Sequence, residues 1–299
     1  MLPARLRCEE GAVKLTSASA LRGLLSQHGL RPRKRLGQHF LVDAGVLDRL
    51  VATIDPQPDE TILEVGAGAG VLTTRLAERC RRVIAMEVDP GLGAVLATVL
   101  KSYSGVDIRI EDIMAVPVTS LAADKIVGNL PYYLTSPLLF RLLKPGIAAR
   151  RLVLMVQEEV AGRITASPGT REYGVLSVIC AYRARTERVM RVSPGSFWPR
   201  PEVYSAIVSL ELCQDRPEDL PLFALVETAF AQRRKTLTNN LCQAGLEKGL
   251  VHQIMREAGI DPSRRGETLT VDEFQALKQT IAVAAPGFTL RPPGRNAKL

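Results

Sequence analysis

The chain has 299 residues, of which 46% are hydrophobic, and a formal net charge of +8 at pH 7. This length allows a large domain with a smaller second one, and the hydrophobic content is ordinary for a soluble globular protein. No apolar run approaches the roughly 18 residues of a membrane span. The N-terminus lacks the apolar core of a secretory signal. A short transit peptide stays an alternative, because Arg5, Arg7, Ser17 and Ser19 fit its composition while Glu9 and Glu10 argue against it.

The positive charge is concentrated at the two ends. Residues 1–35 carry +6 and residues 286–299 carry +3, whereas the 250 residues between them hold 28 basic and 29 acidic side chains. Basic ends on a neutral body favour a polyanionic partner such as nucleic acid; tails that serve solubility are the alternative.

Five cysteines and three histidines are scattered along the chain without a CxxC pair or an HExxH motif. We therefore expect neither a disulfide framework nor a metal site. The composition is typical of a reduced, cytoplasmic protein.

The first expected element is an amphipathic helix over 17–30, followed by the basic run 31–35 and the glycine-bearing segment 36–41. This run is either a solvated loop or a flap at an RNA or cofactor site. Asp43 is expected to cap a second helix, with Val46 and Leu47 on its buried face.

We expect a strand over 61–65 and a helix over 71–80, with the glycines Gly66, Gly68 and Gly70 between them. This order is typical of the first βα unit of a nucleotide-binding sheet. The dinucleotide fingerprint needs a glycine or alanine where Val71 stands, so the pattern disfavours NAD and FAD.

The next strands, 83–86, 106–110 and 125–128, are followed by Glu87, by Asp112 and by Asn129. A single acid in such a place is usually a helix cap. Polar groups after four consecutive strands favour a common ligand at the carboxyl edge of the sheet. Glu87 is positioned to accept hydrogen bonds from ribose hydroxyls.

Asn129 opens the tetrapeptide Asn129-Leu130-Pro131-Tyr132, which combines an amide, a stiffened backbone and an aromatic face. A strand-to-helix turn is the alternative interpretation. An amide oxygen, a fixed carbonyl and a ring suit a flat base that carries an exocyclic amine.

Thr135 or Ser136 is expected to cap the following helix. A strand over 152–156 and helices over 157–166 and from Val175 come next, and residues 186–192 and 203–211 alternate as strands near a sheet edge do. Between the last two lies a loop, 193–201, whose prolines and aromatic rings suit either a base-stacking platform or a hydrophobic lid.

Residues 214–221 have the composition of a linker, and every later segment reads as helical. We expect four parts: a basic N-terminal extension with its helix (1–35), an α/β domain (36–213), a helical C-terminal domain (214–285) and a disordered basic tail (286–299). The cluster Arg233-Arg234-Lys235 is either a solvated helix corner or a phosphate contact.

The glycine turn, Glu87, Asp112 and Asn129–Tyr132 resemble S-adenosylmethionine-dependent adenine N6-methyltransferases. Over roughly residues 20 to 280 the chain resembles one family of these enzymes, the ribosomal RNA adenine dimethyltransferases, and most of all its small-subunit members. The motifs specific to that family are Gly37-Gln38-His39-Phe40-Leu41, the loop Ser196-Phe197-Trp198-Pro199 and the segment Arg233-Arg234-Lys235-Thr236-Leu237.

This resemblance implies a Rossmann-like methyltransferase sheet, S-adenosylmethionine as cofactor without a metal, and 16S rRNA of the small subunit or its precursor as partner of a monomeric protein. The implied reaction is dimethylation of two adjacent adenosines near the 3′ end of that RNA. A large-subunit rRNA dimethyltransferase and a non-catalytic assembly or transcription factor on the same fold are the alternatives.

The implied residue roles fall into four groups. Family members usually carry Asn at the position of His39, so this chain departs from the family pattern there. The cofactor would contact His39, Leu41, Gly66, Glu87, Asp112 and Asn129; transfer would involve Asn129, Leu130, Pro131 and Tyr132; Tyr132 and Phe197 would stack on the target base; and Arg33, Lys34, Arg35, Arg233, Arg234 and Lys235 would bind RNA.

Overall fold

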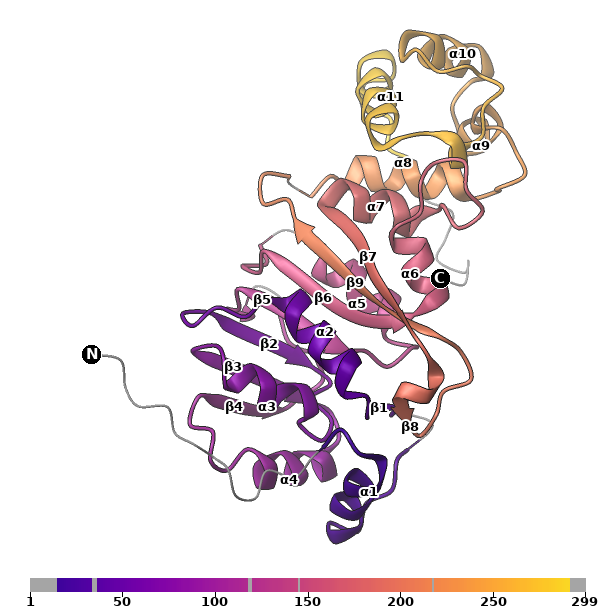
Figure 1. Cartoon of the computed structure of the whole chain (residues 1–299). Helices are drawn as coiled ribbons and strands as arrows, with labels where there is room; N and C mark the ends of the chain where they lie inside the picture. The colour runs from indigo at the N-terminus through magenta and orange to yellow at the C-terminus, as the bar shows by residue number, and fades with distance from the viewer. Residues whose placement is uncertain (1–14, 34–36, 118–119, 145, 217, 291–299) are drawn as a thin grey trace.

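The computed structural model describes residues 15–33, 37–117, 120–144, 146–216 and 218–290. A twisted sheet forms the centre of the molecule, helices flank it, and a helical group stands at one end (Figure 1). The strands are β1 (Phe40–Leu41), β2 (Thr61–Val65), β3 (Arg82–Glu87), β4 (Val106–Ile110), β5 (Lys125–Asn129), β6 (Arg151–Gln157), β7 (Ala184–Val192), β8 (Phe197–Trp198) and β9 (Ser205–Leu212). The helices are α1 (Ala18–Gln27), α2 (Ala44–Ile54), α3 (Val71–Ala77), α4 (Pro90–Val99), α5 (Thr135–Leu142), α6 (Glu158–Ile164), α7 (Val175–Arg183), α8 (Leu220–Phe230), α9 (Leu237–Gln243), α10 (Lys248–Glu257) and α11 (Val271–Ala284), with short 3-10 turns at Pro194–Ser196 and Gly266–Thr268.

Seven strands form the main sheet in the order β4-β3-β2-β5-β6-β9-β7. The first five are parallel, and β9 runs antiparallel to both of its neighbours. From β2 the chain moves outward through β3 and β4 and then returns to β5 on the other side. The strand order therefore reverses between β2 and β5, and ligands of open α/β sheets bind at the carboxyl ends beside such a point.

The alternating segment 203–211 does not lie at the sheet edge. It forms most of β9, which is enclosed between β6 and β7, while β7 is the edge strand. Two polar residues of this segment, Ser205 and Ser209, are small and buried, whereas Glu211 near the end of β9 is exposed. Small hydroxyl side chains fit a packed interior, so most of the alternating segment is enclosed.

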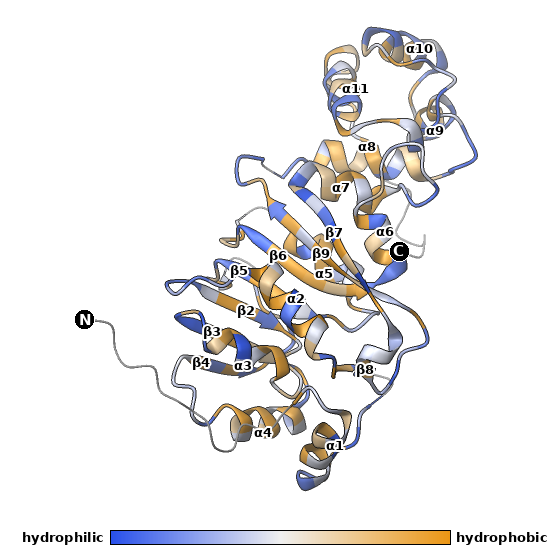
Figure 2. Ribbon diagram, in the orientation of Figure 1, coloured by the Kyte–Doolittle hydropathy of each residue, from blue (hydrophilic) through white to orange (hydrophobic). Residues whose placement is uncertain are grey.

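Two apolar clusters cover the two faces of the sheet, and Figure 2 shows apolar residues along its strands and on the helices beside it. Helix α2 begins as expected at Asp43, whose Oδ1 accepts from the Val46 N–H over 3.1 Å. The expected cap of α5 is wrong: Leu134 holds the N-cap position, and the Thr135 hydroxyl donates to the Pro131 carbonyl over 3.4 Å.

Helices α8 to α11 surround a third apolar cluster, which also includes Tyr173, Val178 and Tyr182. Because these three residues lie on α7 and the segment before it, the helical region packs directly onto the α/β part. The expected disorder of the tail is wrong for residues 286–290, since Phe288 packs on this cluster and Leu290 is buried. The rest of the tail, residues 291–299, lies outside the described residues, and the proposed division at residue 214 stays a prediction.

Within the parts of the chain that the structure describes, no helix combines the length and the apolar character that crossing a membrane requires.

Candidate active site

A cavity of about 290 Å³ opens at the carboxyl ends of β2, β3 and β5, beneath the segment 37–41. Most of the residues that the motifs single out meet there, although they come from points up to 90 positions apart. Its walls include Gln38, His39, Leu41, Glu64, Gly66, Gly68, Glu87, Asp112, Asn129, Pro131 and Tyr133.

The glycine turn forms one wall of the cavity. Gly66, Gly68 and Gly70 have φ angles of 74°, 59° and 85°, which side chains disfavour. A β-carbon on Gly68 would also lie only 3.2 Å from the Phe40 ring. The Gly66 and Ala67 N–H groups both donate to the Met86 carbonyl, which ties the turn to the end of β3.

Glu87 ends β3 and is almost fully buried. Its Oε2 accepts from the Gly68 N–H over 2.9 Å, and its Oε1 accepts from the N–H groups of Val88 and Asp89. Burial raises the pKa of the Glu87 carboxyl, although these backbone donors oppose that rise. Two donors thus occupy both lone pairs of Oε1, whereas Oε2 keeps one for a hydroxyl of a ligand.

Asp112 follows β4 and is exposed at the mouth of the cavity. Its Oδ1 accepts from the Met114 N–H over 2.8 Å, which is the local turn contact of an ordinary strand-end acid. The same carboxylate therefore shapes its loop and borders the cavity.

Asn129 is the last residue of β5, and its Nδ2 donates to the His39 carbonyl over 2.8 Å. Beside it, the Leu130 side chain is buried and its N–H donates to the Met155 carbonyl. The Pro131 carbonyl already accepts from the Leu134 N–H over 2.9 Å. Of the two carbonyls considered from the sequence, that of Pro131 is thus engaged within its turn, although Pro131 lines the cavity and the 1%-accessible Leu130 does not.

Tyr132 and His39 stack on each other with ring centroids 5.7 Å apart and planes inclined by 25°. The Tyr132 hydroxyl contacts the Ser205 hydroxyl over 2.9 Å, and burial raises the pKa of that phenol. His39 Nδ1 lies 2.7 Å from the Pro199 carbonyl. Because a carbonyl only accepts, Nδ1 carries the hydrogen of this contact.

The loop 193–201 reaches the site through β8, which pairs with β1 in the register Leu41↔Phe197. The expectation that Phe197 exposes its ring is wrong, because only 4% of the residue is accessible and it packs in the cluster beneath β1. Trp198 is partly exposed, with the Arg22 guanidinium 5.4 Å from its ring centroid. The loop is thus largely the hydrophobic lid that the sequence left as an alternative.

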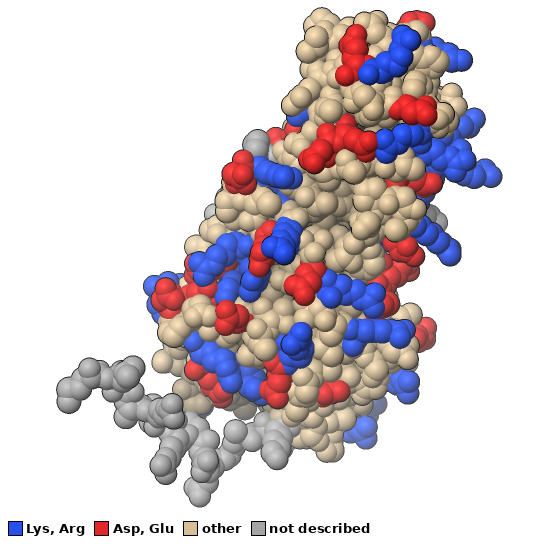
Figure 3. Space-filling model, turned by 45° about the horizontal axis from the view of Figure 1, so that its top comes forward, with Lys and Arg blue, Asp and Glu red and all other residues tan. Residues whose placement is uncertain are grey.

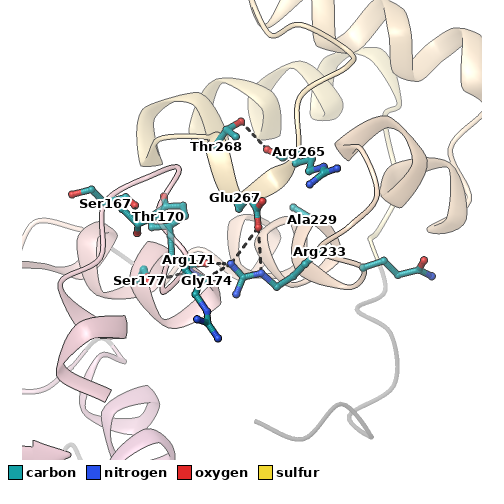
Figure 4. A network of polar contacts seen from close by, with 12 residues as sticks. Ser167, Thr170, Arg171, Gly174, Ser177, Ala229, Arg233, Arg265, Glu267 and Thr268 are labelled. Carbon is teal, nitrogen blue, oxygen red and sulfur yellow. Dashed lines mark hydrogen bonds and ion pairs between the residues drawn. The ribbon is translucent and has the colours of Figure 1, made fainter. Parts of the chain in front are cut away.

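The basic residues expected to bind RNA differ in their surroundings. Arg33 pairs with Asp89 at 3.3 Å, whereas Lys34 and Arg35 lie outside the described residues. Arg233 donates to Glu267 and to the carbonyl of Arg171, as Figure 4 shows. It also donates to the carbonyl of Tyr173. Arg234 and Lys235 are exposed. Basic and acidic side chains intermingle on the face drawn in Figure 3.

The polar cavity residues that had no role in the sequence interpretation include Gln38, Glu64 and Tyr133. Gln38 donates to Asp89 over 3.2 Å, and Tyr133 is 60% exposed. Glu64 is buried within β2. A charged residue inside the apolar run Thr61–Val65 was the one signal that pointed to it.

The sequence model of the family described as ribosomal RNA adenine dimethylase matches residues 29–282. The chain is 38% identical to Ribosomal RNA small subunit methyltransferase A of Alkaliphilus metalliredigens, over 90% of this chain and 98% of that protein. It is 41% identical to the protein of the same name from Pelotomaculum thermopropionicum, with the same coverage.

Solved structures share the fold. A dimethyladenosine transferase from Plasmodium falciparum matches with a TM-score of 0.76 at 22% identity, over 85% of this chain and 100% of that one. The 23S rRNA methyltransferase ErmE matches with a TM-score of 0.66 at 24% identity, over 81% and 98%. The Rossmann-like methyltransferase fold that the family resemblance implied is thereby confirmed. With a family match over most of its length, the chain belongs to the ribosomal RNA adenine dimethylases.

Proposed function

We propose that this enzyme transfers methyl groups from S-adenosylmethionine to the exocyclic N6 of two adjacent adenosines near the 3′ end of 16S rRNA, two to each, and acts as a monomer. The observation that carries the proposal is the fixed amide of Asn129. Its Nδ2 is held by the His39 carbonyl, which leaves Oδ1 as the acceptor for an amine. The names of the curated relatives support the small subunit as the source of the RNA.

The residues around the cavity fit the cofactor. The glycine turn offers backbone without side chains, Glu87 offers carboxylate acceptors, and Asp112 borders the opening. Leu41 and Gly66 would line the methionine end, and His39 and Asn129 would stand between cofactor and base. When bound, the cofactor supplies a methyl group already activated by a sulfonium sulfur.

The protein's task is then to prepare the amine. The lone pair of an adenine amine is delocalised into the ring, so the nitrogen is a weak nucleophile. Asn129 Oδ1 and the Leu130 carbonyl would accept its two hydrogens and favour a pyramidal nitrogen with its lone pair aimed at the methyl carbon. Tyr132 would stack on the base, and such positioning can lower a barrier by about 7–11 kcal/mol.

The target adenosine has to be unpaired or flipped out of a stack before its amine reaches this pocket. Loops of folded RNA offer such bases. The exposed Arg234 and Lys235 would contact phosphates of the same RNA at the helical end of the molecule.

The test is incubation of purified protein and labelled cofactor with under-methylated small subunits, followed by digestion and separation of the nucleosides. We expect N6,N6-dimethyladenosine from small subunits and none from large subunits. Absence of the product with cofactor binding intact would refute the proposed reaction. Product from large subunits alone would assign the protein to the other ribosomal substrate.

A further inference from the structure

Arg141 lies in the last turn of α5 and reaches across to the loop that follows β4. Its Nη1 donates to the carbonyl of Met114, and its Nη2 donates to the carbonyl of Val116. These two partners lie 27 and 25 positions earlier in the chain. No ion pair between described residues includes Arg141, so its guanidinium is committed to this loop.

The loop that Arg141 holds forms one wall of the cavity. Asp112, Ile113 and Met114 all line that wall, whereas Arg141 is not one of the described residues that line it. The Met114 N–H donates to Asp112 Oδ1 over 2.8 Å, and the Ala115 N–H donates to the Asp112 carbonyl over 2.9 Å. Met114 is therefore fixed at both of its backbone groups, to the Asp112 carboxylate at one and to the Arg141 guanidinium at the other.

This wall has few other directional contacts to the body of the protein. Strand β4 stands at the end of the main sheet, so it has a neighbouring strand on one side only. Asp112 itself is exposed, and Met114 and Val116 pack partly on the apolar cluster to which α5 contributes. Apolar packing is non-directional, whereas the planar fork of an arginine sets the direction of the groups that it binds. The two donors of Arg141 therefore decide where the carboxylate stands.

We propose that Arg141 is a positioning residue for the adenine end of the cofactor, which acts by holding Asp112 where its carboxylate accepts a hydrogen bond from the adenine amine. The inference rests on the proposed function. A carboxylate only accepts, and in the proposed arrangement the ribose hydroxyls belong to Glu87 and the methionine end to Leu41 and Gly66. The amine is then the donor that remains for the acid at the mouth of the cavity.

The preference for an amine over a carbonyl at the same position of the base tests this role. S-adenosylhomocysteine carries the amine, whereas S-inosylhomocysteine carries a carbonyl oxygen there, which a carboxylate repels. Titration calorimetry with each compound gives the ratio of the two dissociation constants. Wild type should bind the adenine compound about 5- to 10-fold more tightly, the effect of one hydrogen bond at an exposed carboxylate. Asp112→Ala should lose most of this preference.

Arg141→Met keeps an unbranched side chain and loses both donors, so its preference should fall to that of Asp112→Ala. The double variant Asp112→Ala, Arg141→Met should show the same preference as Asp112→Ala, because both changes remove one contact. Arg141→Lys has a single ammonium for two carbonyls and should keep only part of the preference. Arg163→Met is the matched control. Arg163 also stands in the last turn of its helix, α6, but it pairs with Glu159, so this variant should keep the wild-type preference.

Steady-state transfer separates positioning from a general loss of folded protein. In Arg141→Met the KM for S-adenosylmethionine should rise, while kcat at saturating cofactor stays within about twofold of wild type. The reason is that the groups proposed to prepare the amine of the target base, Asn129 and Tyr132, keep their own contacts. Loss of folded protein would instead lower kcat and leave the preference between the two bases unchanged.

A wild-type preference in folded Arg141→Met, or a further loss in the double variant, overturns the inference. If Arg141→Met does not fold, Arg141→Lys decides: a reduced preference supports the role, and a wild-type preference contradicts it. If Asp112→Ala keeps the preference, the inference fails while the proposed methyl transfer stands. If the wild-type protein binds neither S-adenosylmethionine nor S-adenosylhomocysteine, the proposed function fails and the role of Arg141 with it.

Discussion

Asn129 Nδ2 donates to the backbone carbonyl of His39 over 2.8 Å and so joins β5 to the segment that covers the cavity. The two residues lie 90 positions apart. This one contact sets the direction of the Asn129 amide and ties the segment 37–41 to the end of β5.

Replacing Asn129 by alanine should lower methyl transfer by about 100-fold or more, the effect of losing one positioned polar group in a reacting site. RNA binding should stay within a few-fold of wild type, because phosphate contacts dominate it. Single-turnover transfer and filter binding measure the two quantities. Asn129→Asp is the matched control: it keeps the oxygen acceptor but removes the donor to His39, and we expect it also to be strongly impaired. Activity of Asn129→Ala within a few-fold of wild type would remove this residue from the chemistry.

Replacing His39 by asparagine should preserve most of the activity. Asparagine can also donate from its side chain to the Pro199 carbonyl. The contact between the segment 37–41 and the loop 193–201 is therefore retained, while the stack on Tyr132 is lost. His39→Ala loses both, and we expect a loss of about 1 kcal/mol of unfolding free energy from the hydrogen bond. Denaturant unfolding and steady-state transfer give the comparison; equal behaviour of the two variants contradicts the role of the Nδ1 donor.

Replacing Tyr132 by alanine should reduce transfer roughly 5- to 150-fold, which corresponds to about 1–3 kcal/mol for one stacked base. Tyr132→Phe keeps the ring and loses only the hydrogen bond with the Ser205 hydroxyl, so it should retain most of the activity. Ser205→Ala breaks the same hydrogen bond from the other side and serves as the control. If Tyr132→Phe is as inactive as Tyr132→Ala, the hydroxyl matters more than the ring.

Much of the sheet could be predicted because its signals are local. The apolar runs, the glycine turn and the polar residue after each strand lie within a few positions of one another, and parallel strands place their carboxyl ends at one edge. The gathering of Gly66, Glu87, Asp112 and Asn129 around one cavity follows from that geometry.

The errors have a common physical cause, which is packing by distant segments. The prolines around Phe197 indicated a stiff loop, but its ring is buried because β8 pairs with β1, more than 150 positions earlier. Arg233 was grouped with its basic neighbours, although Glu267 and two remote carbonyls engage it.

A buried ionic cluster offers a prediction on stability. Glu60 and Lys125 are both buried and lie 2.9 Å apart, and Arg150 also pairs with Glu60. Burial raises the pKa of Glu60, but the Gln57 N–H, Lys125 and Arg150 outweigh it and hold the pKa below its usual value. Glu60→Gln should therefore lower the unfolding free energy at pH 7 by about 3 kcal/mol, because Lys125 stays buried without its counter-charge.

The pH dependence follows from the lowered pKa of Glu60. The contribution of Glu60 to the unfolding free energy is complete above the ordinary pKa of a glutamate, about 4.3. It is lost as pH falls through the lower pKa that Glu60 has in the folded protein. Denaturant unfolding of wild type and Glu60→Gln should thus converge in acid. In the double variant Glu60→Gln, Lys125→Met both charges are absent. Its loss of unfolding free energy should therefore be smaller than the sum of the losses in the two single variants.

We expect the basic cluster to separate into a clamp, Arg233, and a phosphate-binding pair, Arg234 and Lys235. Arg233 joins the turn before α9 to the segment preceding α7 and to Glu267, as Figure 4 shows. Arg233→Ala should lower the unfolding free energy by about 1.5–3 kcal/mol, the range for hydrogen bonds to charged groups. Arg234→Ala with Lys235→Ala should leave stability unchanged and weaken RNA binding. The slope of log K against log salt should fall by about one for each phosphate that the variant no longer neutralises.

Arg233→Lys tells a clamp from a phosphate-binding residue. Lysine keeps the positive charge but replaces the planar fork, which bridges a carboxylate and two carbonyls, by a single ammonium. If Arg233 acts as a clamp, the lysine variant should lose stability almost as the alanine variant does while its salt slope stays that of wild type. If it binds phosphate instead, lysine should restore RNA binding and alanine should lower the slope. Thermal unfolding and salt-dependent RNA binding of wild type, Arg233→Ala and Arg233→Lys therefore decide between the two roles.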